Sequence, residues 1–157
     1  MKKFFYLLLM ALPVVFFASC DDNDNNLPNV NVSIDISGGV RVDDIIYVVK
    51  GDTLKVEKIN VVNREQGKNA IINSASYSWD YHYMGISTVP PFGASIVTDD
   101  MEIGHHLLQI ECPVYAVDKS AAKLYMAYKV DVVSSSDDIP EGTVTTSFSD
   151  QFLLQDN

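Results

Sequence analysis

Three histidines are the residues of this sequence whose chemistry first suggests a metal site: His82, His105 and His106. His105 and His106 are adjacent in a segment with strand-like alternation, so their side chains point to opposite faces and cannot chelate one ion together. His82 could meet His105 across strands, but a zinc site needs three or four convergent ligands. We therefore interpret them as surface and structural histidines and expect no metal site.

Carboxylate clusters raise a second hypothesis, weak calcium binding. Asp99, Asp100 and Glu102 are the candidates, because calcium prefers oxygen ligands. No acidic cluster of the sequence has the spacing of a recognised calcium loop. Ordinary solvated acids are the favoured interpretation.

Catalytic motifs are missing from the sequence. It contains no Gly-x-Ser-x-Gly elbow, no phosphate-cradling glycine loop and no His-Glu-x-x-His. Cys112 shares one face of an expected strand with Ile110 and Val114, which suits a small core residue better than a nucleophile. We expect a protein that is not an enzyme and holds no cofactor.

The first residues have the order of a signal peptide. Lys2 and Lys3 precede an apolar run from Phe4 to Ala18, and small residues end it. The run is about 15 residues long and contains Pro13, whereas a membrane-spanning helix needs roughly 20. We expect residues 1–19 to be removed; a permanent anchor helix is the alternative.

The end of this leader, Phe17-Ala18-Ser19-Cys20, resembles the lipobox of bacterial lipoproteins. The resemblance implies lipidation of Cys20, with acyl chains such as palmitate, and a membrane anchor. The acidic stretch over residues 21–26 is similar to the tether of surface lipoproteins of the Bacteroidota. That similarity implies the outer membrane and the cell surface, with the periplasmic face, or an ordinary solvated linker, as alternatives. A lipidated Cys20 leaves Cys112 without a disulfide partner.

The charge balance excludes one class of partner. Loss of Lys2 and Lys3 with the leader leaves 9 basic against 21 acidic residues. Binding a polyphosphate requires clustered Lys and Arg, so nucleic acid is not an expected partner.

Period-two alternation from Val30 to Asp131 predicts an all-β domain over residues 29–134, after a tether at 20–28. Side chains expected to point into the core are Ala75, Tyr77, Trp79 and Tyr81 in one strand. In a final hairpin they are every second residue from 106 to 114 and from 124 to 132. Ser95–Thr98 is expected at a sheet edge. Residues 135–157 form an acidic tail in which 143–148 alternate weakly and suit one extra edge strand, and in which residues 152–154 have apolar side chains suited to docking.

Two short motifs then resemble a known superfamily. Tyr77-Ser78-Trp79-Asp80 is similar to the core strand of polycystic-kidney-disease (PKD) type and related immunoglobulin-like domains. Glu102-x-Gly104-x-His106-x-Leu108 resembles their corner, in which an aromatic ring bonds back to the backbone near the strand start. The resemblance implies an antiparallel immunoglobulin-like sandwich of about seven strands. His106 stands where the family has Tyr, Leu108 where antibody domains have Cys, and no Gly-Asp-Gly follows Asp80.

The loop from Tyr83 to Phe92 is the strongest candidate for a ligand-binding segment, with Tyr81, Tyr83 and Phe92 as stacking residues. The favoured interpretation of the loop is that its apolar residues Met84, Ile86 and Phe92 cover one end of the core. Three functions fit these expectations: a surface-anchored interaction module of an envelope assembly, a glycan-binding lipoprotein for polysaccharide uptake, and an adhesin or pilus-like subunit that assembles by strand addition.

Overall fold

The computed structural model describes residues 27–63, 69–142 and 145–154. The predicted signal peptide, the lipidation site at Cys20 and the tether up to residue 26 lie outside these ranges. Within them, no helix has the length and apolar character needed to cross a membrane.

The described chain is nearly all β-structure, which confirms the prediction of an all-β protein. A short 3-10 helix, η1 (Ser136–Asp138), follows the ninth of ten strands. The strands are β1 (Val30–Val42), β2 (Ile45–Val49), β3 (Thr53–Asn63), β4 (Ala70–Ile72), β5 (Ala75–Trp79), β6 (His82–Ser87), β7 (Ala94–Val97), β8 (Gly104–Ala116), β9 (Ala122–Val133) and β10 (Thr145–Leu154). Strands β4 and β6 come in addition to the seven expected, and β10 lies in the tail where one extra edge strand was expected.

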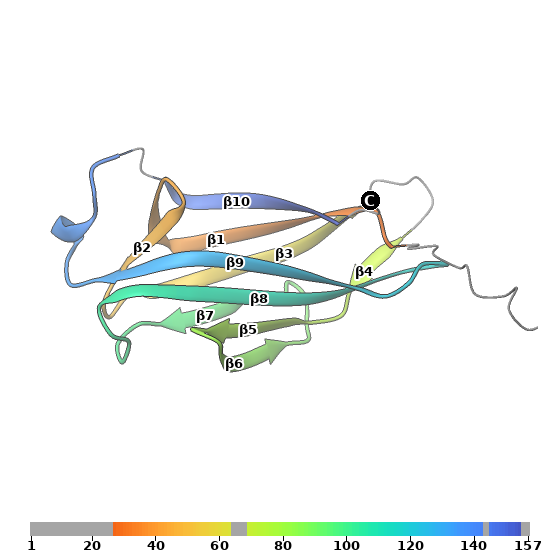
Figure 1. The fold of residues 1–157 in the computed structure, drawn as a ribbon, viewed down its shortest axis with the longest axis horizontal. Coiled ribbons are helices and arrows are strands. Elements are labelled where there is room, and N and C mark those ends of the chain that lie inside the picture. Colours follow the sequence, from red (N-terminus) through yellow and green to blue (C-terminus); the bar gives the residue numbers. More distant parts are fainter. Residues whose placement is uncertain (1–26, 64–68, 143–144, 155–157) are drawn as a thin grey trace, which may run out of the picture.

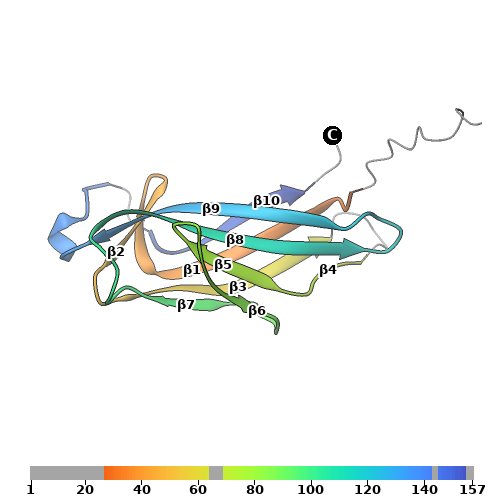
Figure 2. The same cartoon turned by 60° about the horizontal axis from the view of Figure 1, so that its bottom comes forward.

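All ten strands belong to one sheet. Its order is β6-β5-β8-β9-β2-β1-β3-β7, with β10 attached to β1 and β4 attached to β8. The sheet curls until β5, β8 and β9 face β1, β3 and β7 (Figure 1, Figure 2). Strands β2 and β9 run parallel, which the all-antiparallel prediction missed.

One strand joins the two halves of the curled sheet. Residues 30–37 of β1 pair with β3 and β10, whereas Val40–Val42 pair with β2. The change of partner falls at Gly38, whose φ of +80° is rarely adopted by residues with a side chain. A Cβ there would lie 2.1 Å from the main-chain oxygen of Thr53, so only glycine lets the two strands approach this closely.

The core is formed by the alternating inward positions of both halves, as predicted for β8 and β9. Cys112 lies in it, fully buried, and burial raises the pKa of its thiol to about 12. The largest fully buried side chains are Ile34, Ile36, Ile46, Leu54, Ile96, Leu108, Ile110, Met126, Val32, Val48, Val114 and Val130.

The C-terminal segment contributes more structure than the predicted tail. Strand β10 pairs with β1 from Val30↔Leu154 to Arg41↔Thr145, so it includes residues 145–148 of the weakly alternating stretch and the apolar residues 152–154. Nη1 of Arg41 lies 2.7 and 2.9 Å from the two carboxylate oxygens of Asp150. The Arg41 guanidinium also lies 4.8 Å from the centre of the Phe148 ring. These contacts hold β10 against β1.

Candidate functional site

The outer face of β5, β8 and β9 carries a shallow hollow. Alternate residues of these strands point away from the core. Ser76 lies opposite Glu111 and Ser78 opposite Gln109 on β8. The hollow has a volume of about 240 Å³ and is lined by Ser76, Ser78, Tyr81, Gln109, Ile110, Glu111 and Tyr125. We call it the outer-face hollow.

Two exposed tyrosines border the outer-face hollow from opposite sides of β8. Tyr81, 79% exposed, comes from the turn after β5, and Tyr125, 67% exposed, comes from β9 opposite Glu111. Single exposed aromatic residues are ordinary on protein surfaces, but here two of them line one hollow. Tyr125 was missed as a site residue from the sequence, although it occupies an outward position of a predicted strand.

The carboxylate in the hollow is charged and paired. Glu111 lies 2.6 Å from Nζ of Lys123. The hydrogen bond from Lys123 holds the pKa of the Glu111 carboxyl below its usual value, so the group is ionised at neutral pH and accepts hydrogen bonds only. The pair leaves this part of the hollow without net charge.

Tyr81 lies where the chain reverses, which corrects the prediction that it continues the inward face of β5. Trp79 pairs with His82, so Asp80 and Tyr81 form a two-residue turn, with φ of 47° and 66°. Such a turn requires positive φ at both positions and prefers Asn-Gly or Asp-Gly. A tyrosine in the glycine position is strained, and its ring projects into solvent.

Asp80 anchors this turn to the start of β8. Its Oδ1 accepts the Leu107 N–H at 2.8 Å, and its own N–H donates to the Leu107 oxygen at 2.9 Å. Its Oδ2 lies 2.6 Å from Nδ1 of His106. These three interactions offset the strain of the turn.

His106 forms the corner that the sequence motif predicted, with an imidazole in place of a phenol. Its Nε2–H donates to the main-chain oxygen of Glu102 at 2.8 Å. The ring lies against Trp79, with centroids 5.1 Å apart, and Nε1 of Trp79 is 3.1 Å from Nδ1 of His106.

The charges in this cluster shift two pKa values. Burial alone lowers the pKa of His106, but hydrogen bonds to Asp80 and the Glu102 oxygen, and the charges of both acids, outweigh it and raise the pKa above 6.5. Burial alone raises the pKa of Asp80, but hydrogen bonds from His106 and Leu107, and the charges of His106 and His82, bring it below 3.8. The pair therefore exists as imidazolium and carboxylate at mildly acidic pH.

Phe92 is buried, as expected if it covers one end of the core, and it is not available as a stacking residue for a ligand. It is 8% exposed, and its main-chain oxygen accepts a hydrogen bond from the Tyr77 hydroxyl. Its φ of 61° turns the chain so that the ring after the two prolines enters the core. Tyr83, 66% exposed, lies on β6 opposite Ser78, next to the outer-face hollow.

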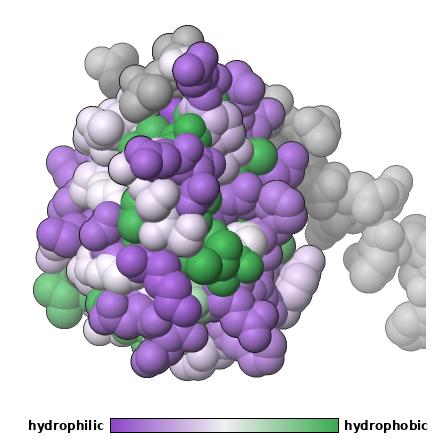
Figure 3. All heavy atoms as spheres, turned by 90° about the vertical axis from the view of Figure 1, so that its left-hand side faces the viewer, coloured by the Kyte–Doolittle hydropathy of each residue, from purple (hydrophilic) through white to green (hydrophobic). Residues whose placement is uncertain are grey.

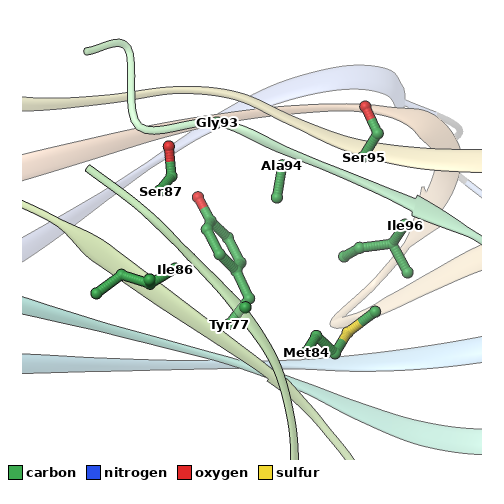
Figure 4. Close-up of a pocket in the computed structure, with 9 residues that line it drawn as sticks. Tyr77, Met84, Ile86, Ser87, Gly93, Ala94, Ser95 and Ile96 are labelled. Carbon is green, nitrogen blue, oxygen red and sulfur yellow. The ribbon is translucent and has the colours of Figure 1, made fainter. Parts of the chain in front are cut away.

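A second hollow separates the two end strands of the sheet, β6 and β7. Its volume is about 220 Å³, and it is lined by Tyr77, Met84, Gly85, Ile86, Ser87, Gly93, Ala94, Ser95 and Ile96. Figure 4 shows Tyr77 between the two edges, with its hydroxyl toward the Gly93 segment. Within the described chain, β6 pairs only with β5 and β7 only with β3. We call this hollow the edge seam.

The metal candidates do not form a ligand set. In the described ranges, no three His, Cys, Asp or Glu side chains converge on one point, so Asp99, Asp100 and Glu102 are not brought together with one another. His105 is exposed on the face opposite His106 and contacts Asp131. The end of the molecule at which β8 begins is mainly hydrophilic, with separate small hydrophobic groups (Figure 3).

No protein-family model matches the sequence, and no curated protein is significantly similar to it.

Proposed function

We propose that this chain is a non-enzymatic binding module that holds a neutral saccharide in the outer-face hollow. The observation that carries the proposal is the pair of exposed tyrosines, Tyr81 and Tyr125, on either side of a row of hydroxyl, amide and carboxylate groups. A sugar ring has an apolar C–H face that stacks on an aromatic ring, and hydroxyls that need hydrogen-bond partners. The hollow offers both within one shallow surface.

The size of the hollow and the charge of the chain limit the class of ligand. A hollow of about 240 Å³ is smaller than the roughly 300–1,000 Å³ of sites that enclose a drug-sized molecule, so it suits one or two sugar rings of a longer chain. The whole chain has a formal net charge of −10, which repels polyanionic saccharides. Neutral saccharides are therefore the expected class.

The scaffold in this proposal is immunoglobulin-like. Supporting features are the buried Trp79 on β5 beside β8, and the His106 ring bonded to the backbone four residues earlier. The facing halves of the curled sheet, joined through β1, are consistent with a sandwich.

The proposal includes a lipid anchor at Cys20 in the outer membrane, with display at the cell surface as part of a polysaccharide-handling envelope assembly. The leader and lipobox-like residues of the sequence support it. Strand β1 begins at the end of the molecule opposite the start of β8 (Figure 1). A tether that enters at Val30 would hold the Asp80–Tyr81 turn away from the bilayer.

The test is a binding screen of the purified full-length chain against immobilised neutral polysaccharides, followed by calorimetry. Tyr81→Ala and Tyr125→Ala should each weaken the affinity about tenfold, equivalent to about 1.4 kcal/mol. Tyr115→Ala is the matched control, because Tyr115 is an exposed tyrosine of β8 that does not line the hollow. Equal affinities for all four proteins, or no binding to any polysaccharide, would refute the proposal.

A second candidate is strand addition at the edge seam, as in an adhesin or pilus-like subunit. It is favoured by the edges of β6 and β7 that no other described strand pairs with, and by three exposed apolar residues on these two strands, Met84, Ile86 and Val97. If it holds, Ile86→Lys and Val97→Lys should abolish assembly into larger particles. A wild-type chain that stays monomeric in its own envelope would exclude it.

A further inference from the structure

The imidazole of His106 has three polar neighbours for two ring nitrogens. Nε2 faces the Glu102 oxygen, which can only accept, so Nε2 carries hydrogen. Nδ1 faces both Asp80 Oδ2, at 2.6 Å, and Trp79 Nε1, at 3.1 Å. The carboxylate needs a donor at Nδ1, whereas the indole N–H needs a lone pair there. Only one of the two hydrogen bonds can form in a given protonation state.

The proton on Nδ1 thus selects between two arrangements. With the proton present, Nδ1–H donates to Asp80, which then receives hydrogen bonds on both oxygens, from His106 and from Leu107. In the neutral tautomer that keeps Nε2–H on the Glu102 oxygen, the Nδ1 lone pair faces an ionised carboxylate at short range and accepts the Trp79 N–H instead. Asp80 keeps only its interactions with Leu107.

The two arrangements differ in the hydrogen bond to Asp80, and Asp80 holds the turn that carries Tyr81. Asp80 and Tyr81 both hold positive φ without glycine, so the turn depends on the contacts of Asp80 with β8. Losing one of these contacts loosens the turn. Tyr81 is its next residue and lines the outer-face hollow.

The surroundings of His106 have a defined set of charges. Asp80 faces it from the β5–β6 turn, and Glu102 adds a negative charge from the segment before β8. His82, at the start of β6, acts on Asp80. On β9, the cross-strand partner of His106 is the apolar Val130. Negative charge nearest the ring favours the protonated arrangement at mildly acidic pH.

We propose that His106 is a positioning residue whose protonation fixes the Asp80–Tyr81 turn and thereby tightens ligand binding in the outer-face hollow. Loss of one proton from Nδ1 to solvent weakens binding through the turn, with no contact between His106 and the ligand. The inference rests on the proposed saccharide function for its ligand, but its first step, the coupling of ring and turn, is observable without one.

The first experiment follows the ligand-free full-length chain by nuclear magnetic resonance as a function of pH. Trp79 is the only tryptophan of the sequence, so its indole N–H signal is unambiguous. The indole signal and the Tyr81 amide signal should shift with the same midpoint as the His106 ring. His106→Gln should remove this transition, and His105→Gln, which changes the opposite face, should retain it. Asp80→Asn provides a variant that keeps an acceptor for Leu107 and should lower the midpoint.

The second experiment measures the affinity for the polysaccharide selected in the screen, at about pH 5.5 and about pH 8.5. Binding should be about fivefold tighter at the lower pH, a modest coupling between two sites, and His106→Gln should abolish the difference. An indole N–H signal that does not shift as His106 titrates overturns the proposal. Equal affinity at both pH values overturns the regulation and leaves the saccharide function standing, whereas no binding at either pH overturns both.

Discussion

The imidazole of His106 and the main-chain oxygen of Glu102, four residues earlier, are joined by a hydrogen bond of 2.8 Å that closes the corner before β8. The same ring touches Asp80 and Trp79, so one side chain ties this corner to the β5–β6 turn. Tyr81, on that turn, lines the outer-face hollow. His106 therefore connects the corner before β8 with a residue that lines the outer-face hollow.

Replacing Tyr81 by glycine should separate stability from binding. Glycine adopts positive φ freely, so Tyr81→Gly should raise the free energy of unfolding by up to about 1 kcal/mol while the loss of the ring weakens saccharide binding. Urea denaturation and calorimetry provide the two measurements. Tyr81→Ala, which loses the ring but keeps the strained φ, is the control. A glycine variant less stable than the alanine variant would refute the claim of strain.

The free energy of unfolding should depend on pH through the Asp80–His106 pair. The raised pKa of His106 contributes stability that is complete below pH 6.5 and is lost as pH rises through the folded-state pKa. The lowered pKa of Asp80 contributes stability that is present above pH 3.8 and is lost as pH falls through its folded-state value. Denaturation of His106→Gln should lack the loss on the alkaline side. A variant with the wild-type profile would contradict the assignment.

The Cys112 thiol should be inert in the native protein. It is fully buried and its pKa is raised to about 12, so almost no thiolate is present at neutral pH. An alkylating reagent should modify it only after denaturation, as mass spectrometry would show. Cys112→Ser should destabilise the fold by about 1–3 kcal/mol, because it buries a hydroxyl among apolar side chains. Rapid native alkylation would place the residue outside the core.

Strand β10 should loosen when its ion pair is removed. Asp150→Ala leaves Arg41 without its carboxylate partner, and because both side chains are about a quarter exposed the expected cost is modest, about 1 kcal/mol. Hydrogen exchange should then accelerate in β10 and in the half of β1 that pairs with it. Gln151→Ala, an exposed neighbour on the same strand, should leave exchange unchanged. Equal exchange in both variants would mean that the ion pair does not hold β10.

Alternation was enough to predict β8 and β9, because both strands keep strict inward and outward positions over their length. Alternation failed at Tyr81, because the turn contains no glycine and the alternating sequence pattern continues into it. The burial of Phe92 depends on a positive φ after the prolines and on the distant Tyr77 hydroxyl, so the sequence left open whether its ring covers the core or stacks on a ligand.

Long-range pairing explains the remaining differences. Strand β10 alternates weakly by itself, and its position depends on β1 and Arg41, far away in the sequence. The outer-face hollow brings Tyr81 and Tyr125 together only because β8 lies between β5 and β9. The hydrogen bond of His106 to the backbone was predictable because its motif is local.

The most direct test of saccharide binding is a map of amide chemical shifts during titration of the full-length chain with an oligosaccharide of the selected polysaccharide. We expect the largest changes at Ser76, Ser78, Gln109, Glu111 and Tyr125, with the signals of β7 and β10 unchanged. Changes confined to the edge seam, at β6 and β7 residues such as Ile86 and Ile96, would contradict this expectation.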